Sequence, residues 1–270
     1  MGAAVETKNL TKQYKTTLAV DNINISVPEG CCCGFLGKNG AGKTTTIKML
    51  VGLNKPTGGQ ISIMGEERVY GKQGTPSFGY LPDVPNFYGY MTGEEFLDLS
   101  GKLCNIPNAE RKARIKSLLQ QVGLDKTRTR IAGYSRGMKQ RLGIAQAMIN
   151  NPPVIFMDEP ISALDPIGRR DVAEIIRSLK DTTVILSTHI LADVEHICDY
   201  VLIIDKGKIL AQDYLANMKQ SRASGTAEIR FANEADARAA MGLLQSNGLP
   251  YESLGIHTPT LEDIFYETIK

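Results

Sequence analysis

A glycine-rich segment at residues 37–44 has the spacing of a loop that binds phosphate groups. Its sequence reads GKNGAGKT and matches the pattern G-x-x-x-x-G-K-[ST]. Glycines let backbone N–H groups turn inward around an anion, and a helix beginning near Gly42 would add its positive N-terminal end. Lys43 can reach the outer phosphates, and the Thr44 hydroxyl can ligate Mg²⁺. The residues that we expect at this phosphate site are Gly37, Lys38, Asn39, Gly40, Ala41, Gly42, Lys43, Thr44 and Thr45.

Two adjacent carboxylates follow a short apolar run at residues 154–157. Such a run predicts a buried strand, and ligands of an open α/β sheet gather beyond the carboxyl ends of its strands. The strand predicted before the glycine-rich loop, residues 31–36, ends at the same edge. We therefore expect Asp158 to associate with Mg²⁺ and Glu159 to orient or deprotonate an attacking water. Taken alone, the pair is also compatible with an ordinary strand terminus.

A third segment, residues 134–141, reads YSRGMKQR and leads from a loop into a predicted helix. Ser135 is a plausible N-cap, and a capped helix start needs no ligand to explain it. Ser135 and the Gly137 N–H group, lying at the start of a helix, could also hold a phosphate group. The functional interpretation gains weight because the glycine-rich loop precedes this segment in the same chain.

Apolar patterns predict an α/β fold that would position these residues. Continuous apolar runs are typical of parallel strands covered on both faces, whereas residues 18–27 alternate. Three helices without an intervening strand indicate a helical insertion at about residues 84–150, introduced by a capping box at Thr92 and Glu95. The predicted strands are residues 18–27, 31–36, 78–81, 154–157, 183–186 and 201–204, and the predicted helices are residues 42–53, 94–104, 109–122, 137–150, 168–180 and 192–197.

A polar stretch rich in small residues, at 219–225, marks a possible domain boundary. We expect one domain at residues 1–218 and a small α+β appendage at residues 219–270. About fifty residues are too few for a robust separate core, so the appendage is interpreted as a lobe added to the main domain. Its predicted order is strand, helix, strand and helix, at residues 227–231, 234–247, 251–256 and 260–269.

Composition and charge exclude several classes of protein. Hydrophobic residues are 42% and charged residues 22%, which excludes an intrinsically disordered chain. The formal net charge of +2 gives no whole-chain signal for nucleic acid. Five cysteines, three of them adjacent, form no disulfide or zinc pattern and favour a reduced, cytosolic chain. No apolar run approaches the ~20 residues needed to cross a bilayer, so we expect any membrane role to come through a partner.

The order of these motifs resembles that of the ATP-binding cassette (ABC) family. The resemblance covers residues 5–215 and includes SALD at 162–165 and STH at 187–189. It implies a P-loop NTPase core with a mainly parallel sheet, an antiparallel β segment near the N-terminus, the helical insertion and the C-terminal appendage. It also implies two cassettes stacked head to tail around two ATP molecules with Mg²⁺. The roles that it assigns are γ-phosphate contact across the dimer for Ser135 and Gly137, coupling between the two sites for Asp165, γ-phosphate contact within the chain for His189, and adenine stacking for Tyr14.

Two positions depart from the pattern of the family. Arg136 stands where the family usually has glycine, so its side chain must either point away from the phosphate or add positive charge near it. Asp83 stands where glutamine is common, a position that contacts Mg²⁺ and links the catalytic core to the helical insertion. Asp83 could still reach Mg²⁺ directly or through water, since Mg²⁺ favours carboxylates and keeps waters. The alternative is a turn residue after Pro82.

The tail adds a narrower resemblance. Residues 258–265 read TPTLEDIF and look like the end of ATPase subunits of bacterial multidrug and ABC-2 type exporters. That resemblance implies ATP hydrolysis coupled to export by a separate transmembrane permease, at the cytoplasmic face of a bacterial membrane. Eleven basic residues between Lys102 and Arg141 would then face the membrane subunit, although a solvated helical face explains them equally.

Three other functions remain open from the sequence. An importer subunit cannot be separated from an exporter subunit by these residues. A soluble ABC ATPase of translation or DNA repair would usually carry two cassettes or a long coiled coil, and the chain has one phosphate loop and no heptad run. A P-loop kinase or GTPase is disfavoured by the serine-glycine and STH motifs. The cargo, and the choice between a homodimer and a heterodimer of cassettes, cannot be read from this chain.

Overall fold

A computed structural model describes residues 2–71, 78–162, 164–221, 227–228, 234–246, 255–256 and 268. The chain divides into two compact units, Met1–Tyr214 and Leu215–Lys270. The division falls four residues before the boundary expected at 218/219, and α7 (Leu215–Ser221) begins there. Within the described residues, no helix combines the length and apolar character needed to span a membrane.

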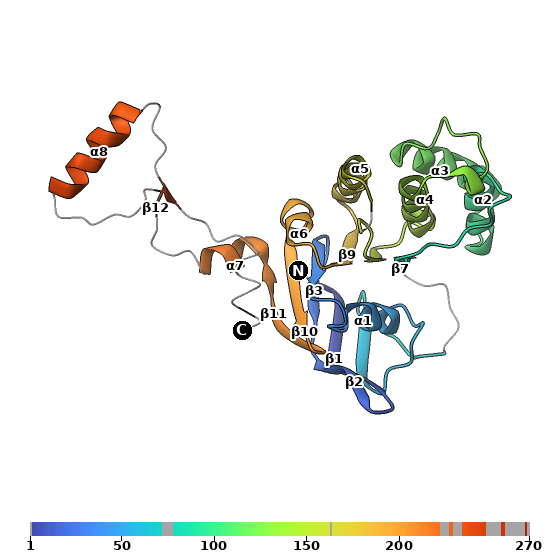
Figure 1. The fold of residues 1–270 in the computed structure, drawn as a ribbon. Helices are drawn as coiled ribbons and strands as arrows, with labels where there is room; N and C mark the ends of the chain where they lie inside the picture. The colour runs from blue at the N-terminus through green and yellow to red at the C-terminus, as the bar shows by residue number, and fades with distance from the viewer. Residues whose placement is uncertain are drawn as a thin grey trace. The chain divides into compact units, whose positions relative to one another are not determined.

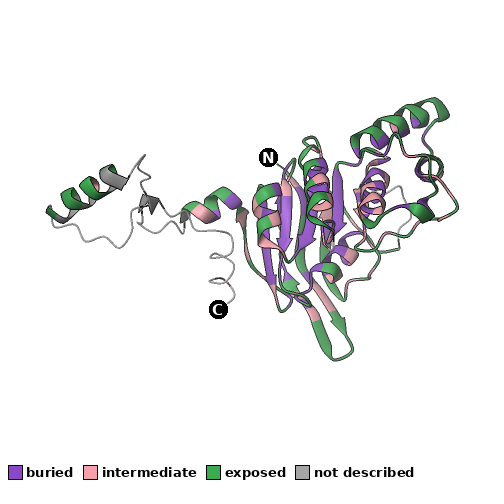
Figure 2. Cartoon of the chain, turned by 45° about the horizontal axis from the view of Figure 1, so that its top comes forward, coloured by how far each residue is buried: buried purple, intermediate pink, exposed green. Residues whose placement is uncertain are grey.

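A six-stranded sheet forms the centre of the first unit (Figure 1). Its order is β11-β10-β4-β9-β8-β7, and all neighbours are parallel except β11 beside β10. The strands are β4 (Cys32–Leu36), β7 (Phe78–Leu81), β8 (Val154–Asp158), β9 (Thr183–Thr188), β10 (Tyr200–Asp205) and β11 (Lys208–Tyr214). Every residue of β8 and β9 is buried, as Figure 2 shows for the centre of the sheet, which confirms the predicted parallel strands covered on both faces.

A second, antiparallel sheet is built on β1 (Ala3–Tyr14), which pairs with β2 (Thr17–Ile23), β3 (Ser26–Pro28) and β5 (Gly58–Ile63); β6 (Glu66–Glu67) extends it. The single strand expected at residues 18–27 is wrong, because the chain breaks between β2 and β3. The buried Thr7 hydroxyl fills the break: it donates to the Ile23 carbonyl and accepts from the Ile25 N–H, both at 3.0 Å. This side chain replaces ladder bonds, which residue alternation could not reveal.

The main core lies between the two sheets, around α1 (Lys43–Leu50). Buried residues from both sheets and from α1 meet there, including Val5, Leu10, Phe35, Ile47 and Phe156. Cys31 and Cys33 belong to the same cluster, so they pack as small hydrophobic residues. The strand that leads into the glycine-rich loop is thereby packed against this core through the face that bears Cys33 and Phe35.

The helical insertion contains α2 (Gly93–Leu103), α3 (Asn108–Gln121), the short 3₁₀ helix η1 (Ile131–Gly133) and α4 (Arg136–Met148). The predicted capping box is present: Thr92 Oγ1 accepts from the Glu95 N–H at 3.2 Å, and the Glu95 carboxylate accepts from the Thr92 N–H at 2.8 Å. Helix α4 approaches β7 so closely that a Cβ on Gly79 would lie 2.1 Å from the Ala147 carbonyl oxygen. The insertion is therefore packed directly on the edge strand of the central sheet.

Helices α5 (Pro166–Arg177) and α6 (Leu191–Ile197) follow β8 and β9 in the first unit. In the second unit, β12 (Ala227–Glu228) pairs antiparallel with β13 (Gly255–Ile256), and α8 (Glu234–Ser246) lies between them in sequence. The helix expected at residues 260–269 lies outside the described residues apart from Thr268, as do residues 258–265.

Candidate functional site

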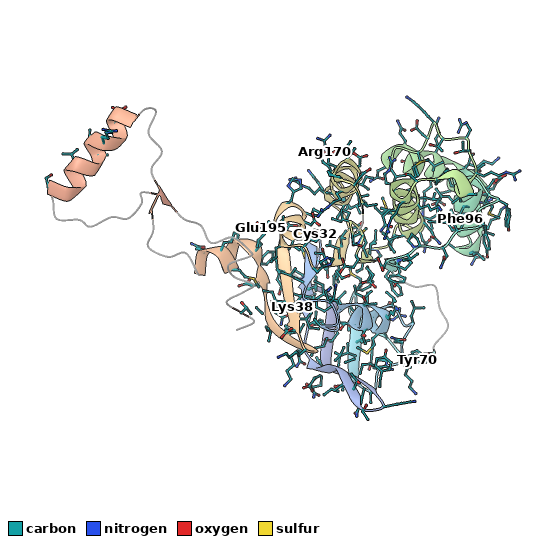
Figure 3. All side chains as sticks on the ribbon, in the orientation of Figure 1. Cys32, Lys38, Tyr70, Phe96, Arg170 and Glu195 are labelled. Atoms are coloured by element: carbon teal, nitrogen blue, oxygen red, sulfur yellow. The ribbon has the colours of Figure 1, made fainter. Side chains whose placement is uncertain are left out.

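The glycine-rich loop connects β4 to α1, and two of its glycines allow a close approach to neighbouring backbone. Gly42 has φ +112, and a Cβ there would lie 2.8 Å from the Ala19 carbonyl oxygen. A Cβ on Gly37 would lie 2.4 Å from the Ile204 carbonyl oxygen. Side chains at these positions would push the loop off the sheet edge, so the folded loop requires glycine. Lys38, labelled in Figure 3, belongs to this loop.

Lys43 lies inside the loop with its side chain only 6% exposed. Its Nζ atom donates to the carbonyl oxygens of Gly37 at 2.7 Å and Lys38 at 3.2 Å. Nζ also lies 3.6 Å from Glu159 Oε1. Burial lowers the pKa of Lys43 from its ordinary value, and the Glu159 charge opposes that shift. The loop therefore holds a desolvated cation whose nearest anion is the expected catalytic base.

Asp158, at the end of β8, accepts hydrogen bonds from two hydroxyl groups on other elements. Thr44 Oγ1 donates to its Oδ1 at 3.0 Å, and Ser187 Oγ, on β9, donates to the same atom at 2.6 Å. Asp158 is 2% exposed. A hydroxyl and a carboxylate are ligand types that Mg²⁺ accepts, and Mg²⁺ usually takes few protein ligands together with phosphates and waters. Among the residues that the structure describes, no group of three or more His, Cys, Asp or Glu side chains forms a metal site by itself.

Glu159 leaves the strand end with a left-handed backbone, φ +49, which is strained for a side chain of this size. Its N–H donates to Ser187 Oγ at 3.0 Å, and its carbonyl oxygen accepts from Ser162 Oγ at 2.9 Å. The Glu159 carboxylate oxygens lie 3.1 and 3.2 Å from His189 Nδ1. Two serines thus hold the backbone in the strained conformation and aim the carboxylate at His189 and Lys43.

One cleft of about 370 Å³ gathers most of the expected phosphate-site residues. The connection between β7 and α2 contributes the exposed Asp83 to this cleft. Asp83 is distant from the glycine-rich loop in the sequence, and the order of strands in the central sheet brings the two together. Burial, followed by the charges of Asp158 and Asp83, raises the pKa of Tyr80 to about 12. The first cleft is lined by Ala19, Asn39, Gly40, Gly42, Lys43, Thr44, Thr45, Asp83, Glu159, Ser162 and His189.

The serine-glycine segment lies at a different cleft, of about 250 Å³. Ser135 caps α4 by accepting from the Met138 N–H at 3.2 Å, and Asp165 caps α5 by accepting from the Gly168 N–H at 2.6 Å. Both caps and Gly137 line this second cleft, together with the exposed Arg136. A single chain therefore does not bring Ser135, Gly137 and Asp165 to the glycine-rich loop.

Tyr14 also lies apart from the first cleft. The residue is 44% exposed, its hydroxyl accepts from Asn54 Nδ2 at 2.9 Å, and Lys12 Nζ lies 4.8 Å from the ring centroid. Adenine stacking on Tyr14 stays a prediction.

Sequence reasoning gave no role to Ser187, which contacts both acids. The feature that could have indicated a role for Ser187 is its position two residues before His189. The register of its strand, β9, places Ser187 opposite Asp158.

A family model described as ABC transporter matches residues 20–162. The uncharacterized ABC transporter ATP-binding protein YxlF of Bacillus subtilis is 43% identical, over 80% of this chain and 72% of the relative. The bacitracin transport ATP-binding protein BcrA of Bacillus licheniformis is 41% identical, over 82% and 72%. The daunorubicin/doxorubicin resistance ATP-binding protein DrrA of Streptomyces peucetius is 36% identical, over 87% and 72%.

Solved structures share the fold. An ATP-binding subunit of an ABC transporter superposes with a TM-score of 0.75 at 29% identity, covering 99% of this chain and 100% of the solved chain. A dimeric bacterial ABC transporter cassette superposes with a TM-score of 0.69 at 24% identity, covering 78% of this chain and 98% of the solved chain. The predicted cassette fold is confirmed.

Proposed function

The chain belongs to the ABC transporter family as an ATP-binding, ATP-hydrolysing subunit, and from that premise we propose that two cassettes close around two ATP molecules to drive export by a separate membrane subunit. The observation that carries the proposal is the distribution of the site over two clefts. The first cleft offers the loop, Glu159 and His189; the second offers the capped helix start with Ser135 and Gly137. Head-to-tail pairing would supply each cleft with the other.

The proposed reaction transfers the γ-phosphoryl group of ATP to water. Lys43 and the loop glycines bind the phosphate chain, which is where positive charge and backbone donors gather. Glu159 accepts the proton of the attacking water, since its carboxylate already reaches into the cleft at hydrogen-bonding distance from His189. His189 then faces the γ-phosphate. The products are ADP and inorganic phosphate.

Mg²⁺ would be held by Thr44 and Asp158, with Asp83 contributing directly or through water. When bound, the ion would neutralise charge on the outer phosphates. The two residues fit this role because their oxygens already meet at 3.0 Å and Thr44 lines the first cleft. Nucleotide binding would also have to replace an existing ion pair, because Lys43 Nζ lies 3.6 Å from the Glu159 carboxylate. Phosphate oxygens would compete for Lys43 and leave Glu159 available as the base.

Export and a membrane partner are proposed from the relatives. BcrA is named for bacitracin transport and DrrA for daunorubicin/doxorubicin resistance, and resistance to a compound is compatible with its export. We place this subunit at the cytoplasmic face of a bacterial membrane, bound to its permease. Co-purification with a membrane protein and substrate efflux from inverted vesicles test this part independently of ATP chemistry.

Glu159→Gln tests the catalytic assignment. The variant should bind ATP, lose turnover by about 10²–10⁴-fold, and sediment as a dimer with ATP but as a monomer without it. The matched control is Glu174→Gln, which removes an exposed carboxylate paired with Arg170 at 3.7 Å on α5 and should leave turnover unchanged. Near-normal hydrolysis by purified Glu159→Gln, or a dimer that ignores ATP, would contradict the proposal.

A further inference from the structure

Two cysteines that are distant in sequence bring their sulfur atoms together in the first unit. Cys32 opens β4 and Cys198 follows α6; their Sγ atoms are 3.8 Å apart across a separation of 166 positions. Cys32 is partly exposed, whereas Cys198 is buried. Figure 3 shows Cys32 beside α6, the helix that bears the labelled Glu195. The pair contributes no residue to either cleft described above.

The backbone around the pair is pinned from both sides. The Cys32 N–H donates to Asp199 Oδ2 at 3.1 Å, and the Asp199 N–H donates to the Cys32 carbonyl oxygen at 2.8 Å. Gly34 lets α6 come close to β4, since a Cβ there would lie 2.6 Å from Val194 Cγ1 and 3.2 Å from Cys198 Sγ. The sulfur contact is therefore set by backbone hydrogen bonds and by close packing.

Strand alternation separates this pair from the neighbouring thiols. Cys31 and Cys33 belong to the core between the two sheets, and Cys31 Sγ lies 3.2 Å from the Pro28 carbonyl oxygen. Cys32 points to the opposite face, toward α6. Adjacent cysteines bridge poorly because a disulfide needs a specific separation of the two Cβ atoms. Cys198 is thus the natural partner of Cys32.

We propose that Cys32 and Cys198 form a redox-sensitive dithiol that a peroxide oxidises to an intrachain disulfide. Closing the bond brings the sulfurs from 3.8 Å to about 2.05 Å, a shift within reach of side-chain adjustment. The Cys32 thiolate, on the accessible side, attacks a peroxide oxygen; the O–O bond breaks, leaving a sulfenic acid and, after proton uptake, one water.

Cys198 completes the reaction as the resolving thiol. Its sulfur attacks the Cys32 sulfur and displaces hydroxide, which takes the Cys198 proton and becomes a second water. Overall, two thiols lose two electrons and two protons, and hydrogen peroxide gains them to become two waters. Burial raises the pKa of Cys198 well above its ordinary value, which assigns the first step to Cys32 and the second to Cys198.

The test treats the full chain with hydrogen peroxide and maps non-reduced peptides by mass spectrometry. We expect two of the five thiols to disappear, a monomer lighter by two hydrogen atoms, a Cys198 peptide linked to the peptide that carries residues 31–33, and full reversal by dithiothreitol. Because residues 31–33 share one tryptic peptide, variants make the assignment. Cys31→Ser and Cys33→Ala should each keep the link, and Cys32→Ser should abolish it. Cys104→Ser is the matched control for a partly exposed thiol elsewhere.

A second measurement tests whether the disulfide fits the native fold or distorts it. The oxidised chain should unfold at a higher temperature than the reduced chain, because a cross-link over 166 positions restricts the unfolded state. The Cys32→Ser variant should show no such shift with peroxide. A link that survives in Cys32→Ser, a link between two chains, oxidation only to sulfinic or sulfonic acids, or a lower unfolding temperature would each overturn the proposal.

Discussion

Replacing Ser187 by alanine should lower both the stability of the fold and the ATPase activity. The reason is that the Ser187 hydroxyl is hydrogen-bonded to both Asp158 and Glu159. Ser187 is fully buried, and its Oγ atom donates to Asp158 Oδ1 at 2.6 Å while accepting from the Glu159 N–H at 3.0 Å. Alanine removes both bonds and leaves the Asp158 carboxylate, which is 2% exposed, with one fewer donor. Water cannot easily take the place of that donor at a buried position.

The size of the effect follows from the partners. A hydrogen bond to a charged group contributes about 1.5–3 kcal/mol to folding, and a neutral one about 1 kcal/mol. Asp158 keeps its bond from Thr44 at 3.0 Å, and the Glu159 N–H keeps an alternative acceptor, the Ser187 carbonyl oxygen at 3.2 Å. We therefore expect Ser187→Ala to lower the free energy of unfolding by about 2–3 kcal/mol, near the charged bond alone.

Urea unfolding measures this loss, with Thr46→Val as the matched control. Thr46 is equally buried, but its hydroxyl donates to a neutral acceptor, the Gly42 carbonyl oxygen at 2.9 Å, so its removal should cost about 1 kcal/mol. Steady-state ATPase activity of Ser187→Ala should also fall, by about tenfold if 1.4 kcal/mol of the orientation is lost from the transition state.

A double-mutant cycle with Asp158→Asn isolates the contact. The coupling free energy between Ser187 and Asp158 should reach about 1.5 kcal/mol or more. If Ser187→Ala unfolds no more easily than Thr46→Val, or the coupling stays below about 0.5 kcal/mol, then the hydroxyl does not hold the acids and the reasoning fails.

Two other residues of the first cleft give separate predictions. Burial lowers the pKa of Lys43 below the ordinary lysine value of 10.5, so its ammonium is lost at lower pH than that of a surface lysine; ATP affinity by calorimetry should therefore begin to fall at a lower pH than the titration of a surface lysine would give, and Lys43→Arg, which stays charged, should flatten that fall. An unchanged affinity in Lys43→Ala would show that the loop is not the phosphate site. Asp83 is an exposed anion in the cleft, so ATP binding should depend steeply on Mg²⁺, and Asp83→Gln should reduce that dependence. Equal Mg²⁺ titrations would favour the plain turn after Pro82.

The sequence could predict what depends on local pattern. The loop at residues 37–44 is recognisable by its fixed spacing. The apolar runs of β8 and β9 predict buried parallel strands, and both strands are present and buried. The resemblance implied an antiparallel β segment near the N-terminus, but no strand was predicted at the residues of β1, because its burial follows an irregular pattern with bulges rather than strict alternation. The break between β2 and β3 depends on Thr7, a residue sixteen positions before Ile23.

The site shows the same division between local and distant information. Spacing predicts Lys43 and Thr44 as site residues, and a pair of acids at a strand end predicts Asp158 and Glu159. The role of Ser187 arises from sheet register, since β8 and β9 pair Asp158 with Ser187 directly. Nothing within either segment encodes that pairing. The left-handed backbone of Glu159 is likewise a property of the assembled edge, supported by hydrogen bonds from two other positions.

The two clefts explain why one chain would need another. The first cleft holds Lys43, Glu159 and His189 but no group from α4, whereas the second holds the α4 start and the carboxylates of Asp165 and Asp171 but no lysine. A two-fold pairing places the same two surfaces in contact twice, so each ATP would lie between unlike halves. Nucleotide then becomes part of the interface, and its binding favours the closed dimer by mass action. In the proposed dimer, hydrolysis would remove the γ-phosphate that both halves contact, which would release the dimer and give the cycle its direction.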